Sequence, residues 1–95
     1  MNRRGHKGRV DENHAEVKQA FEALGCTVVS LAPLGDGVGD LLVGCDMRNY
    51  MVEVKAGDKK LTPDETRFCR NWRGHWQLIN DAQQVPGAVR EWRRA

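Results

Sequence analysis

Three charged residues in the middle of the chain have the types and the spacing needed for chemistry on a phosphate group. Asp40 opens one short apolar run, and Glu53 and Lys55 stand two residues apart in another. Neighbouring carboxylates are costly to bury unless a cation compensates them. Asp40 and Glu53 offer the hard oxygen ligands that Mg²⁺ or Mn²⁺ takes, and the backbone carbonyl of Val54 could add a third ligand. Lys55 would then orient the attacking water or stabilise negative charge on the attacked phosphate.

The same three residues also have a plainer interpretation. Asp40 and Lys55 can form an ion pair at the edge of a sheet, with Glu53 exposed to solvent. A glycine-rich stretch at residues 33–39 directly precedes Asp40. Because glycine has no side chain, such a loop lets a bulky backbone such as that of DNA approach the acids, which favours the interpretation as a site.

The elements that must position these residues can be read from the hydrophobic pattern and the turn signals. We expect a helix over residues 11–24, strands over 26–31, 40–44 and 50–55, a turn over 46–49, a second helix from Thr62 to Gly74, a strand over 76–80 and a last helix over 82–92 that Pro86 and Gly87 interrupt. A helix between the third and fourth strands allows one parallel crossover. The predicted fold is therefore α/β, with a four-stranded mixed sheet flanked by helices.

The third predicted strand alternates, and this alternation assigns its faces. Side chains along a strand point to opposite faces in turn. One face of this strand then carries Tyr50, Val52 and Val54, and the other carries Met51, Glu53 and Lys55.

Length and composition limit the protein to one small folded unit. The chain has 95 residues, of which 40% are hydrophobic and 29% are charged. We expect a basic tail over residues 1–10 and a single domain over 11–95. No apolar run reaches the roughly 18 residues of a membrane span, so we expect no membrane partner and a cytoplasmic protein. The three cysteines form no C-x-x-C pair and are expected to be reduced core residues.

Basic residues gather at the start of the chain, within a formal net charge of only +2. Arg3, Arg4, Lys7 and Arg9 are predicted to bind DNA through its phosphates. The alternative is a solvated tail without a partner. Among the aromatic residues, Trp72 and Trp76 are expected in the core, whereas Trp92 is flanked by arginines and could stack on a base.

Five segments, in order along the chain, resemble the PD-(D/E)XK nuclease superfamily. Within it the chain looks like the small stand-alone VRR-NUC nucleases of phages and bacteria, which are relatives of the archaeal Holliday junction resolvases. The segments lie at residues 13–17, 35–44, 50–55, 61–65 and 72–74, so the resemblance extends over about residues 11–80. It implies a restriction-endonuclease-like αβββαβ core and a metal-dependent hydrolysis of DNA.

The resemblance also implies roles for single residues. Asp40 and Glu53 would be the metal-binding acids, Lys55 the motif lysine, and Glu16 the acid from the first helix that completes the metal site. Glu16 has a second interpretation, because Asn13-x-x-Glu16 is a passable capping box.

Two positions depart from the family pattern. Glu65 stands where relatives often have a glutamine that faces the active site, and its place three residues after Thr62 also suits helix capping. Gly39 stands where the family motif has a proline before the aspartate. The second departure loosens the loop and leaves Asp40 in place.

Together these features predict a Mg²⁺- or Mn²⁺-dependent endonuclease that is selective for branched DNA, either Holliday junctions or flaps. We expect a homodimer, because cleavage of a symmetric junction needs two active sites. The alternative from another class is a non-catalytic DNA-binding module, and a third is a small structural α/β domain. Incubation with a plasmid and with a synthetic junction, in Mn²⁺ and in EDTA, separates these hypotheses.

Overall fold

The computed structural model describes residues 12–35 and 37–95. Its helices are α1 (His14–Ala23), α2 (Pro63–Asn71) and α3 (Val85–Arg94), its strands are β1 (Thr27–Ser30), β2 (Leu41–Cys45), β3 (Arg48–Val54) and β4 (Trp76–Ile79), and it has short 3₁₀ turns at Ala32–Leu34 and Ala82–Gln84. The sheet has the order β1-β2-β3-β4, in which only β3 and β4 are parallel. The predicted α/β class with a four-stranded mixed sheet and flanking helices is confirmed. The predicted basic tail at residues 1–10 lies outside the described residues.

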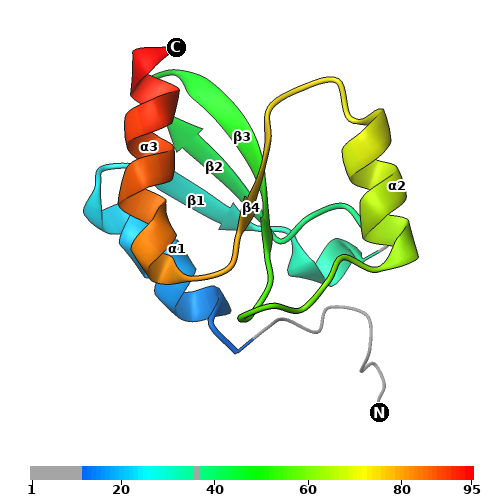
Figure 1. Cartoon of the computed structure of the whole chain (residues 1–95). Coiled ribbons are helices and arrows are strands. Elements are labelled where there is room, and N and C mark those ends of the chain that lie inside the picture. Colours follow the sequence, from blue (N-terminus) through cyan, green and yellow to red (C-terminus); the bar gives the residue numbers. More distant parts are fainter. Residues whose placement is uncertain (1–11, 36) are drawn as a thin grey trace.

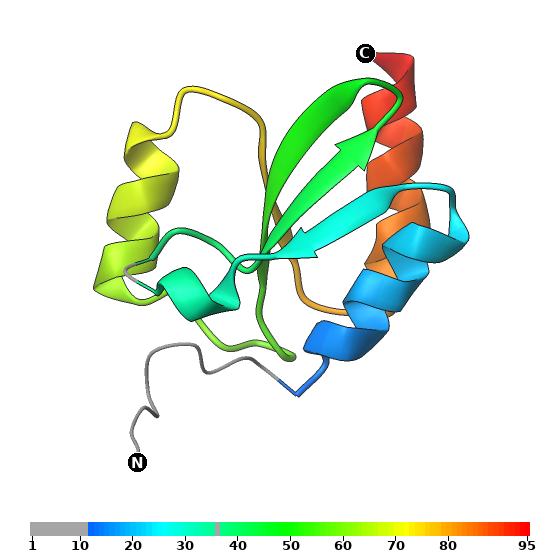
Figure 2. The same cartoon turned by 180° about the vertical axis from the view of Figure 1, so that it is seen from behind.

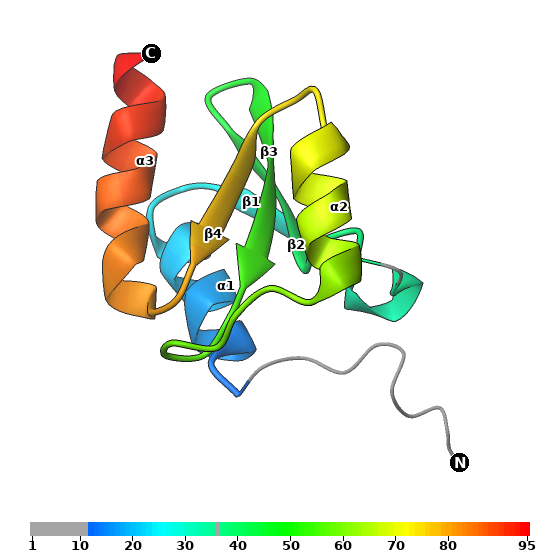
Figure 3. The same cartoon turned by 45° about the vertical axis from the view of Figure 1, so that its right-hand side comes forward.

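The helices cover the two faces of the sheet unequally. Helices α1 and α3 pack together on one face, and α2 lies over the other face (Figures 1 and 3). The main core lies under α1 and α3, where the Trp92 ring stacks between Phe21 and Tyr50 at centroid distances of 5.4 Å and 3.8 Å. Trp92 is only 9% exposed, so the prediction that it could stack on a base is wrong.

The turn between β2 and β3 is shorter than predicted. Asp46 and Met47 both have positive φ, at 54° and 69°, and Arg48 already pairs with Cys45. Positive φ at both central residues is the mark of a type I′ hairpin turn, which matches the twist of the flanking strands. Neither residue is glycine, so the sequence lacked the Asn-Gly or Asp-Gly pair that usually indicates a two-residue hairpin turn.

The bounds of the last two helices also differ from the prediction. Helix α2 ends at Asn71 because Trp72 has an extended backbone, with φ −72° and ψ 127°. Helix α3 begins at Val85, which places Pro86 in its first turn. Proline is tolerated there because the first amide groups of a helix have no partner within the helix. Pro86 therefore starts this helix instead of interrupting it.

The cysteines are free thiols, as predicted, and two of the three are buried. Burial, with a hydrogen bond to Cys45, raises the pKa of Cys26 to about 12. Cys69 on α2 is only partly buried. Among the described helices, none is long and apolar enough to cross a lipid bilayer.

Candidate active site

Strand β3 supplies Glu53, and Lys55 follows directly after the last residue of this strand. Tyr50, Val52 and Val54 belong to the core under α1 and α3, which confirms the predicted alternation. On the opposite face, Glu53 is 3% exposed and Lys55 is 8% exposed. The interpretation that leaves Glu53 in solvent is therefore wrong, and Glu65 of α2 is among the charged groups next to it.

Two hydrogen bonds place Asp40 beside the end of β3. The Asp40 N–H donates at 2.9 Å to the carbonyl of Val52, which is the partner of the next residue, Leu41, in the β2–β3 ladder. The Val54 N–H then donates to Asp40 Oδ2 at 2.8 Å. These two bonds fix the Asp40 carboxylate beside the Glu53 segment. The predicted metal role of the Val54 carbonyl stays a prediction, since the contact between these residues uses the Val54 amide.

The loop before Asp40 needs glycine for reasons internal to the protein. Gly39 has φ +117°, and proline, which is held at about −65°, cannot adopt this angle. At Gly37 a side chain would lie 2.6 Å from the Asp64 carbonyl oxygen of α2. The loop therefore lies directly against the first turn of α2, which Figure 2 shows from behind. Close approach of DNA to this loop stays a prediction.

Glu53 occupies an unfavourable place for a negative charge. Burial, together with a hydrogen bond to Asp40 and the charges of Asp40 and Glu65, raises the pKa of Glu53 to about 10. Without a compensating cation, the carboxyl group is therefore protonated at neutral pH. Glu53 is buried and Asp40 is partly exposed, so a cation placed beside the two acids would compensate their charge.

Lys55 forms an ion pair that the sequence did not predict. Its Nζ lies 2.8 Å from Glu65 Oε1, and both side chains are largely shielded from water. Glu65 also caps α2, because it accepts from the Thr62 N–H at 2.8 Å while its own N–H donates to Thr62 Oγ1. The capping interpretation of Glu65 is thus confirmed, and the same carboxylate additionally holds the lysine.

The ion pair keeps Glu65 charged. Burial opposes ionisation of this carboxyl group, but the hydrogen bonds from Lys55 and from the Thr62 backbone outweigh it and lower the pKa of Glu65. The lysine is therefore paired with the charged acid of α2, and the acid two residues before it on β3 stays neutral. Sequence spacing alone could not tell which acid pairs with the lysine. The only signal in the sequence was a glutamate at the third position of a helix that follows the site strand.

Glu16 is not brought to this cluster. It lies exposed in the first turn of α1. Among the described residues, no three His, Cys, Asp or Glu side chains are placed to hold one metal ion. The capping-box interpretation is also wrong, because the Asn13 side chain makes no capping bond and donates instead to the Asn80 carbonyl at 2.9 Å.

Two further predictions concern the basic residues at the start of the chain and Trp72. Arg3, Arg4, Lys7 and Arg9, predicted to bind DNA, lie outside the described residues. Trp72 was expected in the core, yet it is 43% exposed. Its helical spacing was correct up to Asn71, but the helix ends there and the indole turns outward.

The arrangement can bind a hard cation and present a lysine ammonium next to it. Asp40 and Glu53 provide two adjacent carboxylates, and Mg²⁺ is often held by one or two protein carboxylates together with water and substrate phosphate. The donor set therefore fits this ion without a third acidic residue. No protein-family model matches the chain, and no curated protein matches it.

Proposed function

We propose that this protein is a metal-dependent deoxyribonuclease that hydrolyses phosphodiester bonds, built on a restriction-endonuclease-like core. The observation that supports the proposal is the buried acid Glu53 next to the partly buried Asp40, beside the Lys55–Glu65 ion pair. A structural role alone gives no reason to bury Glu53 next to a second carboxylate, because its charged form loses hydration and is repelled by Asp40. A hydrolase that binds a cation and a phosphate needs this arrangement.

Asp40 and Glu53 would hold Mg²⁺ or Mn²⁺, and Glu53 would release its proton when the ion binds. The bound cation would lower the pKa of water and neutralise charge on the phosphate. Asp40 needs no rearrangement for this role, since the Val54 N–H already fixes its orientation. Preorganised groups of this kind cost little reorganisation during the reaction.

Lys55 would act on the phosphate. Its ammonium has three N–H donors, and one of them is directed to Glu65 at 2.8 Å. The ion pair with the Glu65 carboxylate holds the ammonium on the α2 side of the sheet. From this place the ammonium can stabilise the negative charge that grows on the phosphate in the transition state.

The substrate would be branched DNA in the cytoplasm of a bacterial or phage-infected cell. This part of the proposal is supported by the five segments that resemble the VRR-NUC nucleases. Two active sites in a homodimer would serve the two strands of a junction. The basic residues at the start of the chain would add sequence-independent contacts to phosphates.

The test is cleavage of a supercoiled plasmid and of a synthetic four-way junction by the purified full-length chain. We expect cleavage with Mn²⁺ or Mg²⁺ and none with EDTA. Asp40→Asn and Glu53→Gln should each abolish it, because each replaces a ligating charge by an amide of nearly the same shape. Glu22→Gln is the matched control, since Glu22 is exposed and pairs only locally with Lys18 at 3.0 Å.

The outcomes separate the hypotheses. Full activity of either site variant, with an unchanged circular dichroism spectrum, would refute the site. Binding of the junction without any cleavage in Mn²⁺ would identify a non-catalytic DNA-binding module instead. Glu16→Gln is tested in the same series. Loss of cleavage in this variant would show that Glu16 takes part in the reaction.

A further inference from the structure

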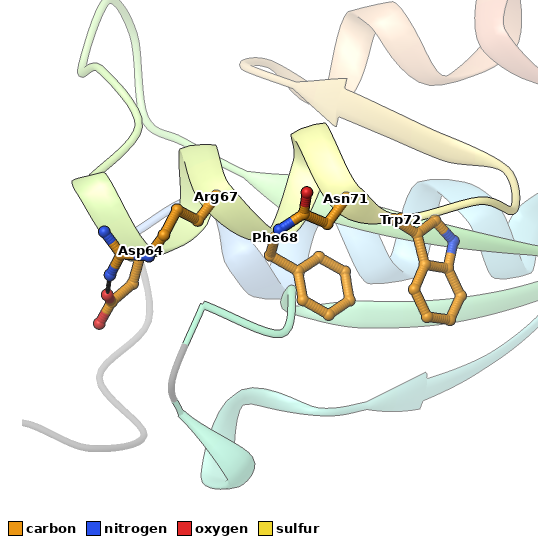
Figure 4. Close-up of a pocket in the computed structure, with 5 residues that line it drawn as sticks. All are labelled: Asp64, Arg67, Phe68, Asn71 and Trp72. Carbon is orange, nitrogen blue, oxygen red and sulfur yellow. Dashed lines mark hydrogen bonds and ion pairs between the residues drawn. The ribbon is translucent and has the colours of Figure 1, made fainter.

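A groove runs along the exposed side of α2, away from the main core. We call it the aromatic groove; it encloses about 310 Å³ and is lined by Asp64, Arg67, Phe68, Asn71 and Trp72. Figure 4 shows the Phe68 and Trp72 rings projecting from the same side of the helix, with Asp64 and Arg67 paired at its beginning. Nothing in the proposed metal site requires this groove.

The two aromatic rings of the groove are held in a defined arrangement. Phe68 and Trp72 stack with centroids 5.2 Å apart and an angle of 17° between their planes. The Trp72 Nε1–H donates to the His75 carbonyl at 3.1 Å, and a side chain at Gly74 would lie 2.8 Å from that nitrogen. The indole is therefore fixed while 43% of Trp72 stays exposed. A fixed, exposed aromatic surface loses little entropy when a flat ligand stacks on it.

The groove and the candidate active site share the first turn of α2. Asp64, at its start, is the chain neighbour of Glu65, which holds Lys55 at 2.8 Å. A DNA strand whose phosphate lies at Lys55 could therefore continue along α2. The Asn71 amide adds a donor and an acceptor for the edge of a base.

Charge on the same surface favours a polyanion over a second copy of the protein. Arg67, Arg70 and Arg73 are exposed along α2 and just beyond it, against one exposed acid, Asp64. Two copies that meet through α2 would bring two net positive surfaces together, which is unfavourable. A nucleic acid strand has the complementary charge, and its bases supply the flat faces that stack on tryptophan and phenylalanine.

We propose that the aromatic groove binds an unpaired base of the DNA strand that is positioned at the active site. This inference rests on the proposed nuclease function and specifies its preferred substrate: DNA with unpaired nucleotides beside the cleaved bond, as at a fork or flap, is bound more tightly than a fully paired duplex. A base within an intact helix is stacked on its neighbours and cannot enter the groove without being unstacked.

The test measures binding without cleavage. The full-length protein in EDTA is titrated with a forked duplex that has a short single-stranded arm, and with a blunt duplex of equal length, while tryptophan fluorescence is recorded. We expect quenching by the fork and little by the blunt duplex. Trp72→Ala should weaken fork binding by about 5- to 150-fold, the range for loss of one stacked base, and leave blunt-duplex binding unchanged.

Trp72→Phe is the matched control, because it keeps a ring in the groove. It should retain fork affinity within a few fold yet lose most of the quenching, since Trp92 is buried in the core and Trp76 is only partly exposed, whereas Trp72 is 43% exposed. Equal weakening of fork and blunt binding by Trp72→Ala, or no weakening of either, would overturn the proposal. A shift from dimer to monomer in Trp72→Ala, measured by light scattering, would overturn it as well and make the groove a protein interface.

Failure of this inference can be told apart from failure of the proposed function. If cleavage depends on Glu53 but the protein shows no preference for the fork, only the inference about the aromatic groove is refuted. If the fork quenches the fluorescence but the protein never cleaves DNA, the groove still binds a base and the proposed nuclease activity is refuted.

Discussion

Replacing Glu53 by glutamine should stabilise the metal-free protein, and the gain should depend on pH. The pKa of Glu53 is raised from its ordinary value of 4.5 to about 10. A group with a raised folded-state pKa contributes stability that is present below the ordinary pKa and is lost as the pH rises towards the folded-state pKa. The wild-type protein should therefore lose stability as the pH rises from about 4.5 to about 10. Glu53→Gln should not lose stability in this way, because its amide has no proton to release in this pH range.

The slope sets the size of the effect. One bound proton more in the folded than in the unfolded state lowers the free energy of unfolding by about 1.4 kcal/mol per pH unit. From about pH 5 to about pH 8 the loss has an upper limit of about 4 kcal/mol. Relaxation of the site and entry of water reduce the penalty of a buried charge, so we expect a difference of about 2 kcal/mol in favour of Glu53→Gln at pH 8.

Urea denaturation in EDTA at a series of pH values measures this difference. Glu22→Gln serves as control and should follow the wild-type curve, since its exposed ion pair contributes little. Adding Mn²⁺ at pH 8 should restore stability to the wild type and not to Glu53→Gln, because a ligand stabilises only the state that binds it. Parallel pH curves for wild type and Glu53→Gln would show that Glu53 is not buried beside a second acid.

Three further perturbations test the site and its frame. Lys55→Ala should lower the single-turnover rate of junction cleavage much more than it weakens DNA binding, because the ammonium acts in the transition state; a fall in affinity alone would reduce Lys55 to a phosphate-binding residue. Deleting residues 2–9 should weaken junction binding and lower the slope of log affinity against log salt by about 0.9 for each phosphate that this segment neutralises, with catalysis at saturating DNA unchanged. Gly37→Ala should destabilise the protein by more than about 2 kcal/mol in urea denaturation, since its side chain would clash with Asp64, whereas Gly57→Ala, also at positive φ but in open space, should cost about 1 kcal/mol.

The sheet and the pairing of Asp40 with Glu53 could be predicted because both depend on short-range patterns. Period-two alternation assigned the faces of β3, and a short hairpin made β2 its neighbour. The contact at 2.8 Å between the Val54 N–H and Asp40 joins residues only 14 positions apart. Antiparallel neighbours at this separation leave few alternatives for the register.

The Lys55–Glu65 pair and the exposure of Trp72 could not be predicted for a common reason. Both depend on where α2 sits over the sheet, and local propensity does not set the docking of a helix. The cap formed with Thr62 was visible in the sequence, but the distance of that cap from β3 was not. Trp72 continues the helical spacing by residue type, yet its extended backbone ends the helix.

Helix α2 has no fully buried residue of its own. Its detachment would thus uncover little apolar surface, and the contacts that hold it include the Lys55–Glu65 pair and the close approach of Gly37 to Asp64. Segments with little buried surface open at a lower free energy than the whole protein unfolds. Opening of α2 would return water to Glu53 and relieve its burial, so in metal-free protein the amide protons of α2 should exchange sooner as the pH rises, relative to those of β3. The stability of one helix would in this way report whether the acids beneath it are protonated.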